Sequence, residues 1–297
     1  MRGMNQMKKT KPVKRVLHRK LNRSHFGNFA VFTILAFIGV FIALPMVFAV
    51  GNSFKPLEEL WVFPPSLFPS NPTMTNFKGL FRLLQGSWVP MSRYLFNTVF
   101  ITVCGTFGHV IFASLCAYAF AKHKFPGRAF LFSLVVFALM FNASVTSVPN
   151  YYIMKTLRWI DTYFAVIIPS FGSALGLFLM KQFMEQIPDS YIEAAKIDGA
   201  REFRIFWTII MPMVKPAWLT LMIFTFQSIW NTQGTQYIYK ENLKTLPTAL
   251  NQLTSSGLSM AGVSSAVAVF LMLPPIIMFL FAQSNVLETM SHSGIKD

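Results

Sequence analysis

Residues 189–200, DSYIEAAKIDGA, continue as REFRIFWTIIMP and carry acidic and basic residues in close succession. Charge is scarce elsewhere, since only 12% of the 297 residues are charged while 54% are hydrophobic and 32 are Phe. Ordinary soluble domains carry about 25% charged residues. Long apolar runs lie on both sides of the segment. The sequence therefore predicts a membrane protein with a polar loop between two of its spans.

Six uncharged runs are candidates for membrane-spanning helices. The first, 29–50, has 22 residues, or about 33 Å at about 1.5 Å per residue, against a hydrocarbon core of roughly 30 Å. The other runs are 94–121, 129–154, 162–180, 216–239 and 266–282. Several are longer than a bilayer requires, so ends such as 147–154 and 231–239 are expected to leave it as loops. The predicted fold is an all-α membrane protein with six transmembrane helices.

The Lys and Arg residues orient the chain, because short basic segments are retained on the cytoplasmic side. A tail over 1–28 holds nine of them and no acid. With six spans, this tail, the 122–128 link, a loop over 183–215 and a tail over 284–297 fall inside; together with Lys181, just after the fourth run, they hold 18 basic residues, against 8 outside. We therefore predict a membrane domain over 29–283, an external segment over 52–93 and cytoplasmic N- and C-termini. The net charge of +15 then reflects topology and attraction to anionic lipid headgroups. A basic tail can also contact nucleic acid, but we predict no nucleic-acid partner.

Catalytic and metal-binding motifs are missing from the sequence. It contains no Gly-rich Lys-Ser/Thr phosphate loop, no HExxH and no Cys pair at metal-ligand spacing. His109 stands alone within a span and is expected to be packed or hydrogen-bonded. Cys104 and Cys116 fall in one span, about 18 Å apart along a helix, which excludes a disulfide between them. We predict that the chain is not an enzyme and binds no cofactor of its own.

The charged segment has the local signals of two short helices. Pro188 breaks the preceding element, and Ser190-x-x-Glu193 has the spacing of a capping box. Gly199 can adopt the left-handed conformation that ends a helix. A second helix over 200–210 would place four apolar residues on one face: Phe203, Phe206, Trp207 and Ile210. Two interpretations fit, an amphipathic loop on lipid headgroups and a docking site for a cytoplasmic partner.

The segment resembles the EAA loop of ABC importer permeases, whose usual pattern is E-A-A-x3-G-x9-I-x-L-P. Six of its seven fixed positions are matched, by Glu193, Ala194, Ala195, Gly199, Ile209 and Pro212. Met211 stands where Leu is usual, a mild apolar exchange. The stretch DSYIEAAKIDGA and the pair Trp230-Asn231 are similar to those of the carbohydrate-importing branch of this family. The permeases of that branch resemble the second membrane subunit of the maltose system. The resemblance covers nearly the whole chain. That branch often continues Trp-Asn with Asp-Phe, whereas Thr232-Gln233-Gly234 follows here and leaves the sugar open. The long tail and YKENLKTLPTAL look closest to a subgroup associated with complex oligosaccharides.

The resemblance implies the type I ABC importer permease fold in a bacterial-type plasma (inner) membrane. It also implies a complex with a second permease, forming a heterodimer, and with two cytoplasmic ATPase subunits that bind the ATP and Mg. An external solute-binding protein would deliver the sugar. The helix pair at 189–212 would dock in a cleft of the ATPase, with small residues at Ala194, Ala195 and Gly199 allowing close approach. Glu193 could offer its carboxylate to an Arg of the ATPase.

Polar residues within the spans are candidates for the substrate path, because they usually face a cavity or a partner helix. They are Asn142, Ser144, Thr146, Tyr151, Gln227, Trp230 and Asn231. Trp230 and Tyr151 could stack on sugar rings, or these residues could instead bridge helices by hydrogen bonds. Gly172-x3-Gly176 and Gly105-x2-Gly108 predict close helix contacts.

Two other functions remain open at this stage. The first is an EAA-type permease for a polyamine, an inorganic anion or another non-sugar solute, although the uncharged spans favour a neutral polyhydroxylated solute. The second is an ATP-independent channel or membrane scaffold, which would tolerate bulky residues at Ala195 or Gly199.

Overall fold

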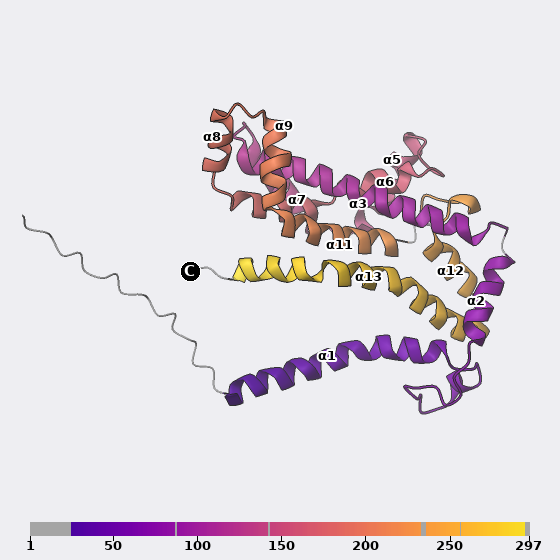
Figure 1. Ribbon diagram of the computed structural model, residues 1–297. Helices are drawn as coiled ribbons and strands as arrows, with labels where there is room; N and C mark the ends of the chain where they lie inside the picture. The colour runs from indigo at the N-terminus through magenta and orange to yellow at the C-terminus, as the bar shows by residue number, and fades with distance from the viewer. Residues whose placement is uncertain (1–24, 87, 142, 233–235, 256, 295–297) are drawn as a thin grey trace, which may run out of the picture. The chain divides into compact units, whose positions relative to one another are not determined.

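The computed structural model describes residues 25–294, except for 87, 142, 233–235 and 256. Every regular element in these ranges is helical, and none of them contains a strand (Figure 1). The chain divides into two compact units, residues 1–47 and 48–297. The predicted all-α class is thus confirmed.

Helix α1 (His25–Ser53) begins in the first unit. It is uncharged and long enough from Gly27 to Ser53 to cross a membrane. Each side chain from Val31 to Val47 is exposed, as expected for a helix whose neighbours are lipid or a partner helix. The span predicted over 29–50 lies within it.

The second unit contains all the other helices. They are the 3-10 turn Glu59–Trp61, α2 (Thr75–Gln85), α3 (Met91–Lys122), α4 (Arg128–Ala138), α5 (Ala143–Thr156), α6 (Phe164–Ser170), α7 (Ala174–Glu185), α8 (Ser190–Ile197), α9 (Glu202–Ile205), the π-helical turn Phe206–Ile210, α10 (Met211–Met213), α11 (Lys215–Asn231), the 3-10 turn Glu241–Leu243, α12 (Leu246–Thr254), the 3-10 turn Leu258–Met260 and α13 (Ala261–Gly294).

Three candidate spans of this unit are long apolar helices. They are α3, the α6–α7 pair over Phe164–Glu185 and the Ala261–Gln283 part of α13. A fourth consists of Glu202–Met213 and Lys215–Asn231, two helices bent by 82°. With α1, the described residues hold four such helices, or five if the bent pair is one span.

The predicted run 129–154 differs most from a single helix. It forms the short α4 and then α5, with Pro149 inside α5. Pro169 similarly lies in the last turn of α6, just before the chain breaks at 171–173 and resumes as α7. Proline removes a backbone donor and disfavours a continuous helix. The six-span topology therefore stays a prediction, whereas the runs 94–121 and 266–282 lie within α3 and α13.

Helix α3 passes through all three buried apolar clusters of the second unit. Tyr94 belongs to the cluster with α2, α12 and α13. Ile101 packs with Ile167 of α6 and Ile229 of α11. Further along, Ala113 and its neighbours on α3 join the cluster of α7, α8, α9 and α11. Figure 1 shows α3 running from the α8–α9 end to the α12 end of this unit.

Close packing around α3 depends on glycine. A Cβ atom at Gly105, Gly108 or Gly176 would lie within 3 Å of a side chain elsewhere in the fold, the shortest distance being 2.0 Å at Gly108. At Gly172 the nearest atom would be 3.7 Å away. The predicted tight contact is thus confirmed for three of the four glycines.

His109 lies in the space that Gly176 leaves. Its Nδ1 atom is 3.1 Å from the Phe171 carbonyl oxygen, and because a carbonyl only accepts, Nδ1 carries the hydrogen. The predicted role as a packed, hydrogen-bonded residue is confirmed, and this bond fixes the break between α6 and α7 against α3.

Candidate functional site

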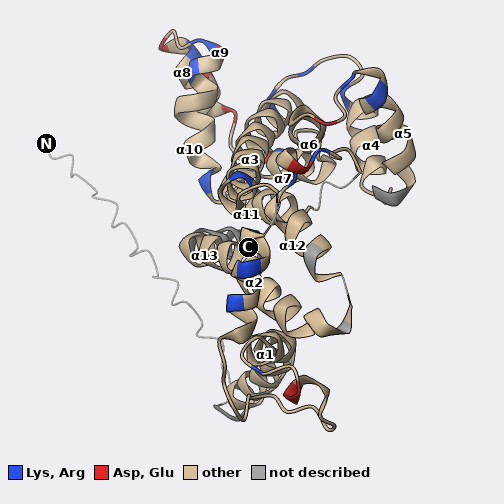
Figure 2. Ribbon diagram, turned by 90° about the vertical axis from the view of Figure 1, so that its right-hand side faces the viewer, with Lys and Arg blue, Asp and Glu red and all other residues tan. Residues whose placement is uncertain are grey.

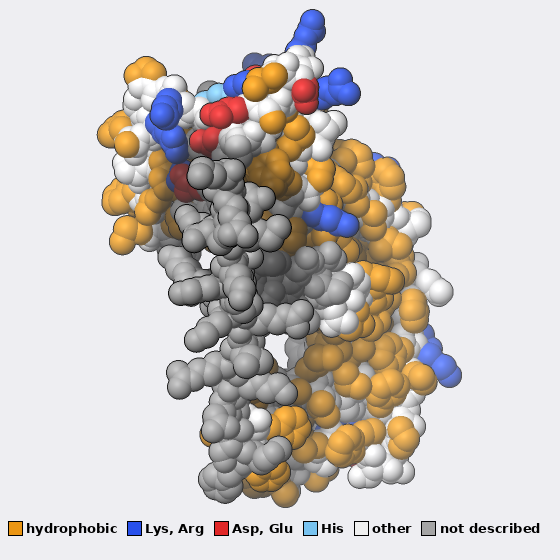
Figure 3. Space-filling model, turned by 60° about the vertical axis from the view of Figure 1, so that its left-hand side comes forward, with side chains coloured by type: hydrophobic (Ala, Val, Ile, Leu, Met, Phe, Trp, Pro, Cys, Tyr) orange, Lys and Arg blue, Asp and Glu red, His pale blue; other side chains and the backbone are white. Residues whose placement is uncertain are grey.

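The candidate site is the segment 189–213, which we call the EAA segment. It consists of α8, α9, the π-helical turn and α10. Most charged residues of the second unit lie at helix ends and in connecting segments (Figure 2). On the face shown in Figure 3, acidic, basic and histidine side chains gather around the α8–α9 end, above a broad hydrophobic surface.

Helix α8 begins one residue earlier than the predicted capping box requires. Asp189 occupies the cap position, and Ser190 is already the first helical residue. Neither the predicted Ser190 cap nor a side-chain cap by Asp189 forms. Asp189 Oδ1 instead accepts a hydrogen bond from Lys122 Nζ at 2.8 Å. The predicted capping box is therefore wrong, because Ser190 lies inside the helix and Asp189, which takes the cap position, pairs with Lys122 of α3.

The end of α8 is a Schellman motif. Gly199 has φ +77° and donates its N–H to the Lys196 carbonyl at 3.0 Å. Ala200 N–H reaches the Ala195 carbonyl at 2.9 Å. These two bonds satisfy carbonyls that a helix end leaves free. The left-handed conformation predicted for Gly199 is confirmed.

The residues of the EAA pattern divide between two faces. Ala195 is buried, beside Ile192 of the same helix, in the cluster shared with α3 and α9, and Ile209 is half-buried. The exposed members of the pattern are Glu193, Ala194, Gly199 and Pro212. The exposed groups at α8 and its C-terminal end are thus the Glu193 carboxylate, the Ala194 methyl group and the Gly199 backbone, which carries no side chain.

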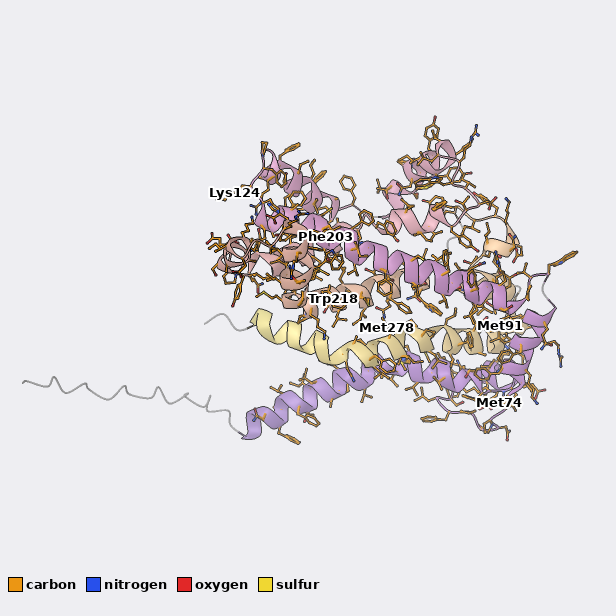
Figure 4. All side chains as sticks on the ribbon, turned by 45° about the horizontal axis from the view of Figure 1, so that its top comes forward. Met74, Met91, Lys124, Phe203, Trp218 and Met278 are labelled. Carbon is orange, nitrogen blue, oxygen red and sulfur yellow. The ribbon has the colours of Figure 1, made fainter. Side chains whose placement is uncertain are left out.

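The second helix of the segment is irregular. Only Glu202–Ile205 is α-helical, and Phe206–Ile210 forms a π-helical turn. Ile205, Phe206 and Ile210 are buried, whereas Phe203 (Figure 4) and Trp207 are exposed. The predicted apolar face is therefore correct for Phe206 and Ile210 only.

Glu202 connects the segment to the end of α3. One carboxylate oxygen accepts the Tyr118 hydroxyl at 2.9 Å and lies 3.7 Å from His123 Nε2. The other lies 2.6 Å from Lys196 Nζ, on α8. One side chain thus joins α3, α8 and α9.

Lys122 and Asp189 make the second connection to α3. The Lys122 side chain is only 5% exposed, and its ammonium also donates to the Ile187 carbonyl. The hydrogen bond and charge of Lys122 lower the pKa of the Asp189 carboxyl. Charge-assisted bonds of this kind are shorter and stronger than neutral ones.

Sequence reasoning missed these contacts. Tyr118 and Glu202 are 84 residues apart, and Lys122 and Asp189 are 67 residues apart. The sequence signal for them is that charged residues are concentrated both in the 122–128 link and in residues 189–204. Pairing between them requires the packing of α8 and α9 on α3, which no local pattern gives.

The predicted substrate-path residues occupy different environments. Asn142 lies outside the described residues, as does the Ser144 side chain. Thr146 and Tyr151 are exposed on α5, and Gln227 and Asn231 are exposed on α11. None of the described side chains of this set lines the apolar cavity of about 710 Å³ between α3, α4, α6 and α7.

Of the members of this set whose side chains the structure describes, only Trp230 is buried. It is 4% exposed, its indole N–H donates to the Leu271 carbonyl of α13 at 3.0 Å, and its ring stacks on Phe226. This is the helix-bridging contact given above as the alternative to sugar stacking.

Comparison with known proteins assigns the family. Residues 29–290 match the binding-protein-dependent transport system inner membrane component. Protein LplC of Bacillus subtilis (strain 168) is 30% identical over 275 residues, covering 87% of this chain and 91% of that protein. The polygalacturonan/rhamnogalacturonan transport system permease protein YtcP of the same strain is 30% identical over 217 residues, covering 73% of each.

A solved structure has the same fold. It is a bacterial ABC transporter involved in the import of the acidic polysaccharide alginate, one chain of which matches with a TM-score of 0.71 and 24% identity, over 88% of this chain and 98% of its own length. The resemblance drawn from the EAA pattern and its neighbouring words is confirmed. The chain belongs to the binding-protein-dependent transport system inner membrane components, the permease subunits of ABC transporters.

Proposed function

We propose that this chain forms half of the translocation path of an ATP-driven oligosaccharide importer and is coupled to the ATPase by the EAA segment. The observation that carries the proposal is the surface of α8. Its exposed residues Glu193, Ala194 and Gly199 leave the backbone accessible, while contacts to α3 and α9 hold the helix in place. A partner can therefore approach closely without unfolding the segment.

The proposed substrate is an oligosaccharide, on two grounds. Relatives and structural neighbours are named for polygalacturonan/rhamnogalacturonan and alginate transport, and the uncharged spans favour a polyhydroxylated solute. The candidate path residues stay those named above: Asn142, Ser144, Thr146, Tyr151, Gln227, Trp230 and Asn231. The first ground points to acidic chains and the second to neutral ones, so both belong in the test.

The proposed complex contains a second permease, two ATPase subunits that bind ATP and Mg, and an external solute-binding protein. The family description itself names dependence on a binding protein. We place six spans in the inner membrane, with both termini and the EAA segment in the cytoplasm, as the basic residues predict. ATP-driven closure of the ATPase would shift the permease between outward-open and inward-open states by differential binding.

Sugar-stimulated ATP hydrolysis by the reconstituted complex tests the proposal. The chain is purified with its co-expressed partners in lipid, and hydrolysis is measured with the binding protein and neutral or acidic oligosaccharides. Gly199→Trp is expected to abolish stimulation. Gly127→Trp is the matched control, because Gly127 also has a positive φ (+81°) and open surroundings but lies outside the EAA segment.

The outcomes separate the alternatives. Loss of stimulation in Gly199→Trp but not in Gly127→Trp supports docking through the EAA segment. Normal stimulation in Gly199→Trp would disprove it, and absence of a co-purifying ATPase would favour the ATP-independent channel or scaffold. Stimulation by a non-sugar solute, such as a polyamine, would leave the coupling intact and replace the substrate.

A further inference from the structure

Helix α3 is a long helix of the second unit that runs without a break or a proline. Among the described helices long enough to span a membrane, α1 contains Pro45 and α13 contains Pro274 and Pro275. The α6–α7 pair is interrupted at 171–173, and α9–α11 is bent by 82°. The 32 residues of α3 contain no proline, and the helix has a place in every buried cluster. It is the stiffest path along this unit.

One end of α3 holds the EAA segment. Tyr118 and Lys122 bind Glu202 and Asp189 at 2.9 and 2.8 Å. Movement of α8 and α9 therefore cannot occur without either breaking these bonds or moving α3.

The other end of α3, marked by Met91 in Figure 4, holds residues 236–246, which we call the distal loop. Asn97 is fully buried, and its amide donates to the carbonyls of Asn242 and Lys244 at 2.9 and 3.0 Å. Its amide oxygen accepts the Tyr163 hydroxyl at 2.8 Å. A buried amide with all these bonds satisfied fixes the loop firmly, because each bond is costly to leave unmade.

Two further α3 residues bind the same loop. Thr98 Oγ1 accepts the Leu246 N–H at 2.7 Å, and the Tyr94 hydroxyl donates to Glu241 at 2.9 Å. Asp161 also accepts the N–H groups of Tyr239 and Lys240, at 2.6 and 2.9 Å. The backbone of the distal loop is thus fixed at several points, while the side chains of Tyr239, Lys240 and Glu241 remain exposed.

We propose that α3 acts as a rigid rod that transmits movement between the EAA segment and the distal loop, with Glu202 and Asn97 as the positioning residues at its two ends. The inference rests on the proposed function, in which an ATPase moves the EAA segment. It adds a specific route, since α3 is a proline-free helix whose two ends hold the EAA segment and the distal loop. A two-ended link of this kind makes the two sites interdependent.

The reaction rate of a single cysteine on the distal loop reports this movement. In the reconstituted complex, Cys104 and Cys116 are replaced by Ala and the exposed Lys240 by Cys. Alkylation of the new thiol by a membrane-impermeant maleimide is timed without nucleotide and with ATP plus vanadate. Glu202→Ala and Asn97→Ala are each expected to reduce the nucleotide-dependent change in rate by about five-fold or more, the scale of a typical coupling between sites.

Three variants separate transmission from a general loss of structure. Tyr118→Phe removes one oxygen and is expected to weaken the response, and Glu202→Gln, which keeps an acceptor for Tyr118, should lie between Glu202→Ala and the parent. Glu185→Ala is the matched control, because Glu185 pairs with Arg128 and Lys181 of α4 and α7 and touches neither α3 nor α8 through those pairs. It should respond like the parent.

The parent's own activity distinguishes the two hypotheses. A parent that shows no ATPase-driven transport would refute the proposed function, and the inference with it. A parent that transports, but in which the thiol introduced by Lys240→Cys reacts at the same rate with and without nucleotide, overturns the inference alone. So does a Glu202→Ala response equal to that of Glu185→Ala.

Discussion

At the scale of single residues, two kinds of glycine have separate roles in this permease. Gly199 and Gly127 are needed for their backbone conformation, since both have positive φ and no atom lies within 4 Å of the position that a Cβ would take. Gly105, Gly108 and Gly176 are needed for space, because other side chains occupy the position of their Cβ. Substitution is therefore expected to destabilise the protein through backbone strain at Gly199 and Gly127, and through steric overlap at the other three glycines.

Gly199→Ala is expected to lower the stability of the EAA segment by about 1 kcal/mol, because an L-residue is strained in the left-handed region. Gly199→Asn should cost less, since Asn tolerates that region. Protease cleavage between α8 and α9 in the folded subunit measures the difference. Equal cleavage of the two variants would show that backbone strain is not the cause.

Gly176→Ala is expected to destabilise the second unit by about 1–3 kcal/mol, the usual cost of overpacking. The added methyl would lie 2.1 Å from His109 Nε2 and disturb the bond to Phe171. Gly172→Ala, four residues earlier, would place its methyl 3.7 Å from the nearest atom, an ordinary contact distance, and should be tolerated. Thermal denaturation of the purified protein in detergent compares them, and similar melting temperatures would contradict the packing explanation.

At the scale of elements, sequence reasoning worked where a helix end has a local cause. The end of α8 at Gly199 could be predicted because a Schellman motif needs only a few neighbouring residues. Its beginning could not, because Asp189 binds Lys122 of α3. The π turn at 206–210 and the exposure of Phe203 and Trp207 likewise depend on how α9 packs, not on periodicity. The six exact matches to the EAA pattern could be read from sequence, whereas the anchoring residues Tyr118, Lys122 and Glu202 could not.

The attachment of α8 to α3 should weaken only in acid. The pKa of Asp189 is lowered by Lys122, so this pair's contribution is fully present above the unfolded value of about 3.9 and is lost as pH falls through the lowered pKa. Cleavage of the EAA segment by an acid protease should therefore rise steeply at the acid end of its working range and change little above about pH 5.

Asp189→Asn provides the comparison, because it lacks the titrating carboxylate. Its cleavage should be faster than that of the parent at mild pH and should vary less as the solution is acidified. If parent and variant show the same pH profile, the Lys122–Asp189 pair does not control the attachment.

At the scale of the whole molecule, the division into membrane and aqueous segments is the main untested prediction. The basic residues place the 122–128 link in the cytoplasm and the distal loop outside. The exposed Lys124 and Lys240 offer one position in each. In a background without Cys104 and Cys116, Lys124→Cys should react with an impermeant reagent only in inverted vesicles, and Lys240→Cys only in intact cells. Reaction of both from one side would require an even number of crossings between them and a different span count.

The 82° bend between α10 and α11 also determines how far the end of α11 moves when the residues before the bend rotate. Helix α11 has 17 residues, which corresponds to about 25 Å at about 1.5 Å per residue. If the joint stays stiff, a tilt of the short arm by about 10° would swing the far end of α11 sideways by about 4 Å, from that length alone. Such an elbow is a lever with unequal arms: a small rotation imposed on a few residues becomes a side-chain-sized displacement near Asn231.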